Sequence, residues 1–211
     1  MSVSWRHAPA WTAVGAALTA FVGSLASWSA GGGAIDIPWA PTLGLRLSFT
    51  LDGLGALYCL LASGIGAIVF SYGACYLPLH LEHEGQSPKA QWRFWPWMGL
   101  FMIAMIGLAT AQDLVLLFVL FDVTAISSYF LIGFDRERPE ARVAAFMALV
   151  VTGVSAVAVL IAAVLLYAER GTVSIPALLA QPGDGTTMTV AAALLAVGAL
   201  AAGNTVTQIN L

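Results

Sequence analysis

Six apolar stretches, each close to the length that crosses a lipid bilayer, take up most of this chain. A transmembrane helix needs about 20 apolar residues in a row. The stretches are residues 10–30, 52–77, 94–111, 114–134, 143–168 and 188–203. They predict an all-α fold, a polytopic transmembrane helix bundle of about six spans in a single membrane domain over residues 1–211. The first stretch is longer than the roughly 7–15 residues of a signal-peptide core, so we expect a retained helix.

Charged residues are too few to cover a water-soluble surface. They make up 9% of the chain, whereas hydrophobic residues make up 60%. A soluble domain has about 25% charged residues. The eight Lys and Arg residues are scattered among the loops, so we expect no nucleic-acid partner.

The basic residues also predict the orientation of the chain. Loops on the cytoplasmic side of a membrane protein carry an excess of Lys and Arg. With six spans, the N-terminus shares a side with loops 78–93 and 135–142. That side holds Arg6, Lys89, Arg93, Arg136, Arg138 and Arg142, and the opposite side holds Arg46 and Arg170. We therefore predict a cytoplasmic N-terminus.

Small side chains recur every four residues in the first two spans. The members are Gly15, Thr19, Gly23 and Ser27 in the first span, and Gly55, Cys59, Ser63, Ala67, Ser71 and Cys75 in the second. Such stripes let helix backbones approach closely in lipid. We interpret both as packing faces without chemistry.

Few residues indicate chemistry. Asp52 and Asp113 lie at span ends, where a carboxylate caps a helix N-terminus. The loop residues His80, Glu82, His83 and Glu84 could be drawn as a metal site, but a solvated loop is the better interpretation. No nucleophile elbow, phosphate loop, dinucleotide fingerprint or haem motif occurs. We expect no enzyme active site, no cofactor and no metal.

Asp122 is the exception, because it lies near the middle of the span 114–134. A carboxylate at that depth costs roughly 2.5–3.5 kcal/mol on insertion scales. Two interpretations stay open: a protonated acid hydrogen-bonded across a helix interface, or a proton relay site on a hydrated path. Thr124, Ser127 and Ser128 follow it as candidates for polar contacts at a helix interface.

The run FDVTAISSYFLIGF at residues 121–134 resembles WELTSxSSFLLIG, a signature of the antiporter-like membrane subunits. This family includes the large membrane subunit of Mrp-type sodium/proton antiporters and the proton-pumping subunits of respiratory complex I. Further matches are PTLGLRLSFTLDGLG at 41–55, the segment 60–76 with its GIG, and GTVSI at 171–175. The resemblance covers roughly residues 38–175 and implies a truncated form of a longer protein.

By this resemblance Asp122 occupies the position of the family's fifth-helix glutamate, which couples proton movement to a lysine on the seventh helix. Three departures are visible, of which the first is that Phe121 stands where the family has Trp. The acid is one methylene shorter, and the family's GAFTKSAQ segment is GALAAG at residues 198–203, with alanine in place of lysine.

The resemblance implies a membrane subunit of a Mrp-like monovalent cation/proton antiporter assembly, in which Asp122 carries the proton. The alternatives are a membrane-arm subunit of a complex I-like or inorganic-carbon uptake complex, which would be redox-driven in the first case, and a non-transporting scaffold. Expected partners are other membrane subunits of a hetero-oligomeric complex, the lipid bilayer, and protons, with Na⁺ as a candidate second ion. The expected location is the bacterial inner membrane.

Overall fold

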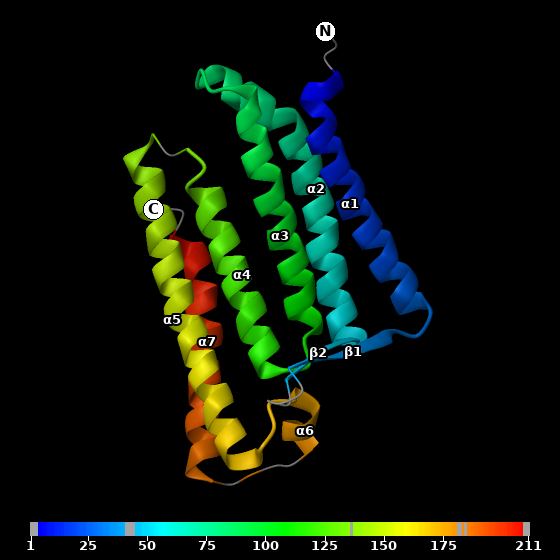
Figure 1. Ribbon diagram of the computed structural model, residues 1–211, viewed down its shortest axis with the longest axis vertical. Coiled ribbons are helices and arrows are strands. Elements are labelled where there is room, and N and C mark those ends of the chain that lie inside the picture. The colour runs from blue at the N-terminus through cyan, green and yellow to red at the C-terminus, as the bar shows by residue number, and fades with distance from the viewer. Residues whose placement is uncertain (1–3, 41–44, 136, 181–182, 184, 209–211) are drawn as a thin grey trace. The chain divides into compact units, whose positions relative to one another are not determined.

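The computed structural model describes residues 4–40, 45–135, 137–180, 183 and 185–208, with side chains between Ala10 and Leu200 (Figure 1). Its helices are α1 (Ser4–Ser29), α2 (Gly53–His83), η2 (Pro88–Ala90), α3 (Gln91–Thr110), α4 (Leu114–Ile132), α5 (Pro139–Arg170), α6 (Ile175–Ala180) and α7 (Thr186–Gln208). Two strands, β1 (Gly33–Ala40) and β2 (Leu45–Leu51), lie between α1 and α2. Arg136 and the side chain of Arg6, which entered the orientation argument, lie outside the described residues.

The chain divides into two compact units. The first comprises Met1–Gly33 and Leu51–Thr110, and the second comprises Ala34–Thr50 and Ala111–Leu211. The first unit therefore holds α1, α2, η2 and α3, and the second holds most of the β1–β2 hairpin with α4, α5, α6 and α7.

Five of the predicted spans coincide with helices long and apolar enough to cross a membrane. Within the described residues these are Ala10–Ser29, Gly53–His83, Pro88–Thr110, Leu114–Ile132 and Pro139–Arg170. The sixth predicted span lies in α7, whose described apolar part, Thr186–Leu200, is shorter than a full span. The prediction of a polytopic, almost entirely helical membrane protein is confirmed, and the small sheet is an addition to it.

Helix α2 is the centre of the first unit, because it packs against both α1 and α3. Its buried residues recur three or four positions apart and include Cys59, Ser63, Ala67, Phe70, Ala74, Leu77 and Leu81. The contact with α3 is close: a Cβ added at Gly66 would lie 2.9 Å from the Met102 Sδ atom. Small residues on α2 thus set the distance between the helices.

The predicted stripe of small residues on α2 is correct for Gly55, Cys59, Ser63 and Ala67, which are buried, and wrong for Ser71 and Cys75, which are exposed. Four residues turn a helix by about 40° more than one full turn, so a strict four-residue stripe winds away from a straight contact. The predicted stripe on α1 is wrong: Gly15, Thr19, Gly23 and Ser27 are not among its buried residues, and α1 buries Ala10, Val14 and Ala17.

Helix α2 also continues beyond the predicted end of its span at residue 77. His80 and His83 form its last turn and Glu84 is its C-cap, so these residues do not lie in a loop as expected. Leu81 is fully buried and continues the contact face, and the rings of Tyr76 and His80 stack with centroids 5.6 Å apart. These contacts extend the helix past Pro78 and the polar residues around it.

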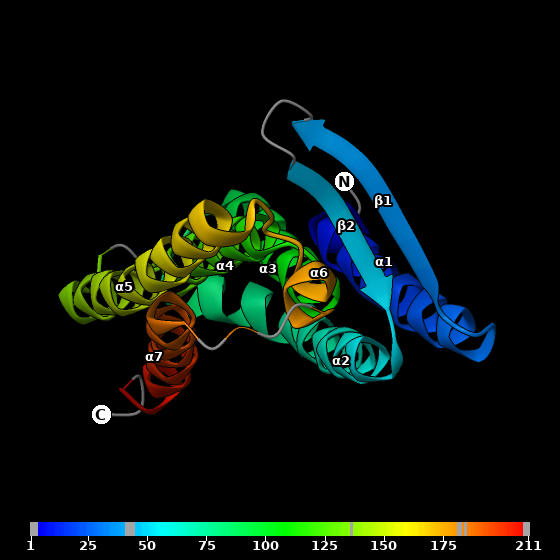
Figure 2. The same cartoon turned by 90° about the horizontal axis from the view of Figure 1, so that it is seen from below.

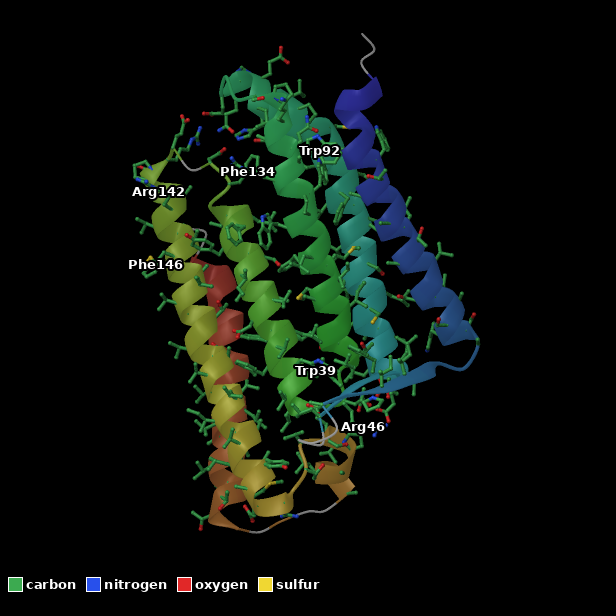
Figure 3. All side chains as sticks on the ribbon, in the orientation of Figure 1. Trp39, Arg46, Trp92, Phe134, Arg142 and Phe146 are labelled. Carbon is green, nitrogen blue, oxygen red and sulfur yellow. The ribbon has the colours of Figure 1, made fainter. Side chains whose placement is uncertain are left out.

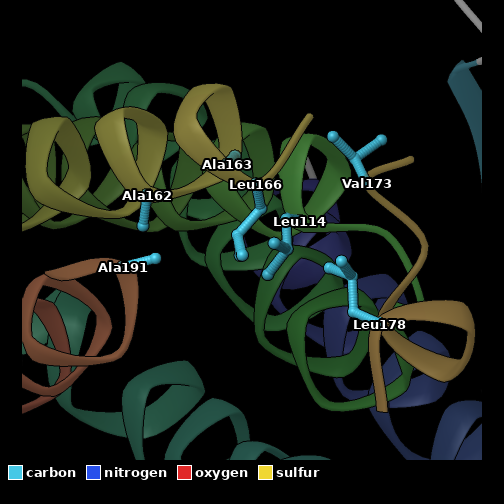
Figure 4. Close-up of a cluster of buried hydrophobic side chains, with 7 residues drawn as sticks. All are labelled: Leu114, Ala162, Ala163, Leu166, Val173, Leu178 and Ala191. Atoms are coloured by element: carbon cyan, nitrogen blue, oxygen red, sulfur yellow. The ribbon is translucent and has the colours of Figure 1, made fainter. Parts of the chain in front are cut away.

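Helix α5 is the centre of the second unit and packs against α4 and α7. A core at one end of α5 joins several elements (Figure 4). It consists of Leu114, Ala162, Ala163, Leu166, Val173, Leu178 and Ala191. Leu45 of β2 packs against this core, which ties the hairpin to the helices of the same unit.

Strands β1 and β2 form an antiparallel hairpin that the sequence analysis did not predict (Figure 2). An exposed ion pair crosses the two strands: Arg46 Nε donates to both oxygens of Asp36, at 2.7 and 2.9 Å. The hydrogen bond with Arg46 lowers the pKa of Asp36 and raises the pKa of Arg46. The hairpin separates the first two spans by a folded element instead of an irregular loop.

The contrast between Ala67 and Cys75 gives a test of the α2 contact face. Ala67→Leu should destabilise the protein by about 1–3 kcal/mol, because it overpacks a filled contact. Cys75→Leu, in the same predicted stripe but exposed, should be close to neutral. Thermal unfolding of each variant in detergent measures the difference. Equal losses in both variants, or none in Ala67→Leu, would contradict the assigned face.

Candidate functional site

Asp122 lies in the middle of α4, at the ninth of its 19 residues. The carboxylate is half-buried. It makes no hydrogen bond or ion pair with any other residue that the structure describes. The side chain therefore stands about 12 Å from the start and about 15 Å from the end of α4, without a partner from the described part of its own chain.

The three hydroxyl residues that follow Asp122 all donate to carbonyls of their own helix. Thr124 Oγ1 donates to Phe121 O at 2.6 Å, Ser127 Oγ to Val123 O at 2.7 Å, and Ser128 Oγ to Thr124 O at 2.8 Å. Thr124 and Ser127 are buried, and Ser128 is half-buried. Their protons are committed to the backbone, so only their oxygen lone pairs are open to a neighbour. A role in polar contacts between helices stays a prediction.

A close contact between the end of α4 and the start of α5 fixes the depth of Asp122 within the second unit. A Cβ at Gly133 of α4 would lie 3.3 Å from the Ala145 Cβ of α5. Eleven residues lead from Gly133 back to Asp122, and eleven lead from Ala145 forward to Ala156 on the antiparallel helix. Asp122 therefore lies level with Ser155 and Ala156 of α5, because both helices rise about 1.5 Å per residue.

The contact between α5 and α7 lies at the same depth. A Cβ at Gly198 of α7 would lie 2.8 Å from Val159 Cγ2 and 3.2 Å from Ser155 O. Glycine is required at this close approach. The segment 198–203, where the family resemblance implies a lysine, thus begins level with Asp122. It carries alanine instead.

Both predicted N-terminal caps are confirmed. Asp52 Oδ1 accepts from Gly55 N at 2.6 Å at the start of α2. Asp113 Oδ1 accepts from Val115 N at 2.9 Å and Leu116 N at 3.1 Å at the start of α4. Asp113 is buried, and burial raises the pKa of its carboxyl, while the hydrogen bonds from Leu116 and Val115 partly offset that effect.

Asp113 belongs to a backbone junction that sequence reasoning missed. Residues 111–113 are extended and paired on both sides, with Phe49 opposite Ala111 and Ser174 opposite Asp113. Gln112 N donates to Ser48 O and Leu114 N donates to Val173 O, at 2.9 and 3.0 Å. The signals in the sequence were the polar pair Gln112-Asp113 between two apolar runs and the family-like GTVSI at 171–175.

The residues that the structure describes contain no group of three His, Cys, Asp or Glu side chains placed to hold a metal ion. His80, Glu82, His83 and Glu84 lie at the end of α2 and do not converge on one point.

The sequence and fold match known membrane subunits. Residues 111–207 match the family described as NADH:quinone oxidoreductase/Mrp antiporter, TM. The putative antiporter subunit mnhA2 of Staphylococcus haemolyticus (strain JCSC1435) is 32% identical over 145 residues, which are 69% of this chain and 17% of that protein. The protein of the same name from Staphylococcus saprophyticus is 31% identical over 147 residues, or 70% and 18% of the two chains. This chain thus spans less than a fifth of the length of these relatives.

Solved structures agree with this match. A chain of the Mrp complex from Dietzia sp. DQ12-45-1b superposes with a TM-score of 0.76 at 26% identity, over 95% of this chain and 24% of that one. A chain of respiratory complex I from Thermus thermophilus shares the fold, with a TM-score of 0.68 at 19% identity, over 92% of this chain and 38% of that one.

The fold and these matches define a polytopic membrane subunit of the antiporter-like class. The chain belongs to the family of Mrp antiporter and complex I-like membrane subunits, as the motif around Asp122 predicted.

The raised pKa of Asp113 predicts a pH dependence of stability. Because the folded-state pKa lies above the usual 3.8, the folded state holds the proton more tightly than the unfolded chain. The stabilisation that Asp113 contributes to the folded state is fully present below the pKa of the unfolded chain. It is lost as pH rises through the pKa of the folded state. Relative to Asp113→Asn, the wild type should therefore lose stability with rising pH, measured by thermal unfolding in detergent from about pH 4 to pH 7.

Asp36→Asn is a control of opposite sign. Arg46 lowers the pKa of Asp36, so the wild type should lose stability relative to this variant as pH falls. Parallel pH profiles for the wild type and Asp113→Asn would contradict the assignment for Asp113.

Proposed function

We propose that this chain is a membrane subunit of a Mrp-like monovalent cation/proton antiporter assembly, in which Asp122 binds and releases a proton. The observation that carries the proposal is the position of this acid. It stands at mid-helix in α4, level with the contact between α5 and α7, and has no partner among the described residues of its chain.

The energetics favour a functional role over a purely structural one. A carboxylate near the bilayer centre costs roughly 2.5–3.5 kcal/mol on insertion scales. A structural acid would offset that cost with hydrogen bonds, because a buried polar group without a partner is destabilising. The nearby hydroxyls of Thr124 and Ser128 already donate to α4 carbonyls. Asp122 therefore needs water, an ion or a group beyond the described residues of this chain.

The missing lysine restricts the mechanism. In the family the proton on the fifth-helix acid is coupled to a lysine, which stabilises the negative form of the acid. Residues 198–203 offer no cation. A proton reaching Asp122 is therefore exchanged with internal water or with a basic group of another subunit, and we expect transport from the whole assembly, with no enzyme active site in this chain.

The absence of a lysine from residues 198–203 also supports a second candidate function, a non-transporting scaffold subunit. A scaffold needs the contact faces of α2 and α5 but not the acid. The two candidates therefore differ in what they predict for Asp122.

We further propose that the chain resides in the bacterial cytoplasmic membrane with its N-terminus in the cytoplasm, on the positive-inside argument. Arg138 is the residue before the start of α5, and Ala180 ends α6, which follows the other end of α5. Single cysteines at these two positions, with Cys59 and Cys75 replaced, should be labelled from opposite sides of the membrane. Labelling of both by an impermeant reagent from one side would contradict the arrangement.

The relay role predicts a separation between folding and transport. Asp122→Asn should fold normally, since it keeps the shape and hydrogen-bonding capacity of the side chain, and it should abolish pH-dependent cation flux in vesicles that contain the whole assembly. Asp122→Glu, which restores the family's acid, should retain flux. Asp36→Asn, an exposed acid in the hairpin, is the matched control and should transport like the wild type.

Unchanged flux in Asp122→Asn would refute the relay role and leave the scaffold as the better account. Thermal unfolding of the same samples separates lost transport from lost folding.

A further inference from the structure

A cavity of about 250 Å³ opens at the end of the α4–α5 pair that carries the 135–138 connection. Tyr129, Phe130 and Gly133 of α4 line it on one side, and Arg142 and Ala145 of α5 line it on the other. Tyr129 and Phe130 stand edge to face, with ring centroids 5.3 Å apart. Figure 3 places Arg142 at the start of α5, near Phe134 at the end of α4. All of these residues belong to the second unit.

The polar side chains of the cavity are all donors of hydrogen bonds or can act as donors. Arg142 offers five N–H groups and Tyr129 offers one O–H. Neither side chain has a hydrogen bond or ion pair with another described residue, and none of the described residues that line the cavity is acidic. An occupant that satisfies them carries negatively charged oxygen atoms, which arginine binds through its planar fork.

The surroundings of the cavity indicate that the occupant also has an apolar part. Val143, Phe146 and Met147, close to Arg142 on α5, are 58–61% exposed. Exposed apolar side chains continue along α5 at Val150, Val154, Val157, Ile161 and Val164. This exposed apolar face belongs to a helix long and apolar enough to cross a membrane, and Arg142 lies in the first turns of that helix, where basic side chains meet lipid headgroups.

We infer that this cavity binds the headgroup of an anionic phospholipid. Arg142 donates to the phosphate oxygens, the Tyr129 hydroxyl donates to a phosphate or glycerol oxygen, and one acyl chain lies along Phe146 and Val150. The acidic residues nearby, Asp135, Glu137 and Glu140, belong to the connection and to the first turn of α5 and do not line the cavity. The site is independent of the role of Asp122.

The test uses the full chain purified in detergent and native mass spectrometry with phosphatidylglycerol or phosphatidylcholine of the same acyl chains. The wild type should retain phosphatidylglycerol in preference to phosphatidylcholine. Arg142→Gln should reduce that preference about fivefold, the effect of one basic side chain at a membrane surface. Arg142→Lys should keep part of it, and Tyr129→Phe should weaken it less than Arg142→Gln.

Arg170→Gln, at the opposite end of α5, is the matched control and should leave the preference unchanged. Inorganic phosphate added in excess should not displace the lipid, because it lacks the acyl chain. An unchanged preference in Arg142→Gln, or an equal loss in Arg170→Gln, would overturn the proposal. Displacement by phosphate would also overturn it and assign the cavity to a soluble anion. Thermal unfolding of every variant confirms that the protein is folded.

Discussion

Hydrogen bonding inside each helix is the constraint on which the rest of this structure depends. No water is available in the bilayer core, so every backbone polar group must find its partner within the protein. The hydroxyls of the spans obey the same rule: Ser63 donates to Cys59 O at 2.6 Å, Thr152 to Ala148 O at 2.7 Å, and Ser155 to Val151 O at 3.0 Å. A hydroxyl that donates its hydrogen bond to a carbonyl of its own helix contributes little to holding two helices together. Neighbouring helices therefore associate through close packing, as where Gly66 meets Met102 and where Gly198 meets Val159.

Where the chain leaves its helices, the same constraint produces the β-pairing. Residues 111–113 cannot leave their backbone groups unpaired in a buried position, and they pair with β2 on one side and with 173–175 on the other. Asp113 completes this junction, because its carboxylate satisfies two of the free N–H groups at the start of α4. The hydrophobic core around Leu114 and Val173 lies directly beside these bonds. Polar pairing and apolar burial thus fix the start of α4, the helix that carries Asp122.

Features that depend on local composition could be predicted from the sequence. The spans follow from apolar runs, and the caps Asp52 and Asp113 follow from a short carboxylate before such a run. Features that depend on packing could not. The buried face of α2 leaves the predicted stripe after Ala67, because helical twist and not residue size decides which side chains meet. The β1–β2 hairpin was missed although β2 reads LRLSFTL, an alternation of apolar and polar residues that is typical of a strand. For the site, the sequence identified Asp122 but not its depth relative to α5 and α7.

That depth is what distinguishes Asp122 from an acid tolerated by accident. Three helices of one unit bring Asp122, Ser155 and Gly198 to one level, and the close approach to α5 at Gly198 leaves no room for a Cβ at that position. Residues 198–203, where the family resemblance implies a lysine, carry no cation. Because no described residue donates a hydrogen bond to Asp122 or pairs with it, its charge has to be stabilised by water or by a group beyond the described residues. The described residues thus pack closely at this level without supplying Asp122 with a charge partner, and this is the physical basis of the proposal that the acid acts within an assembly.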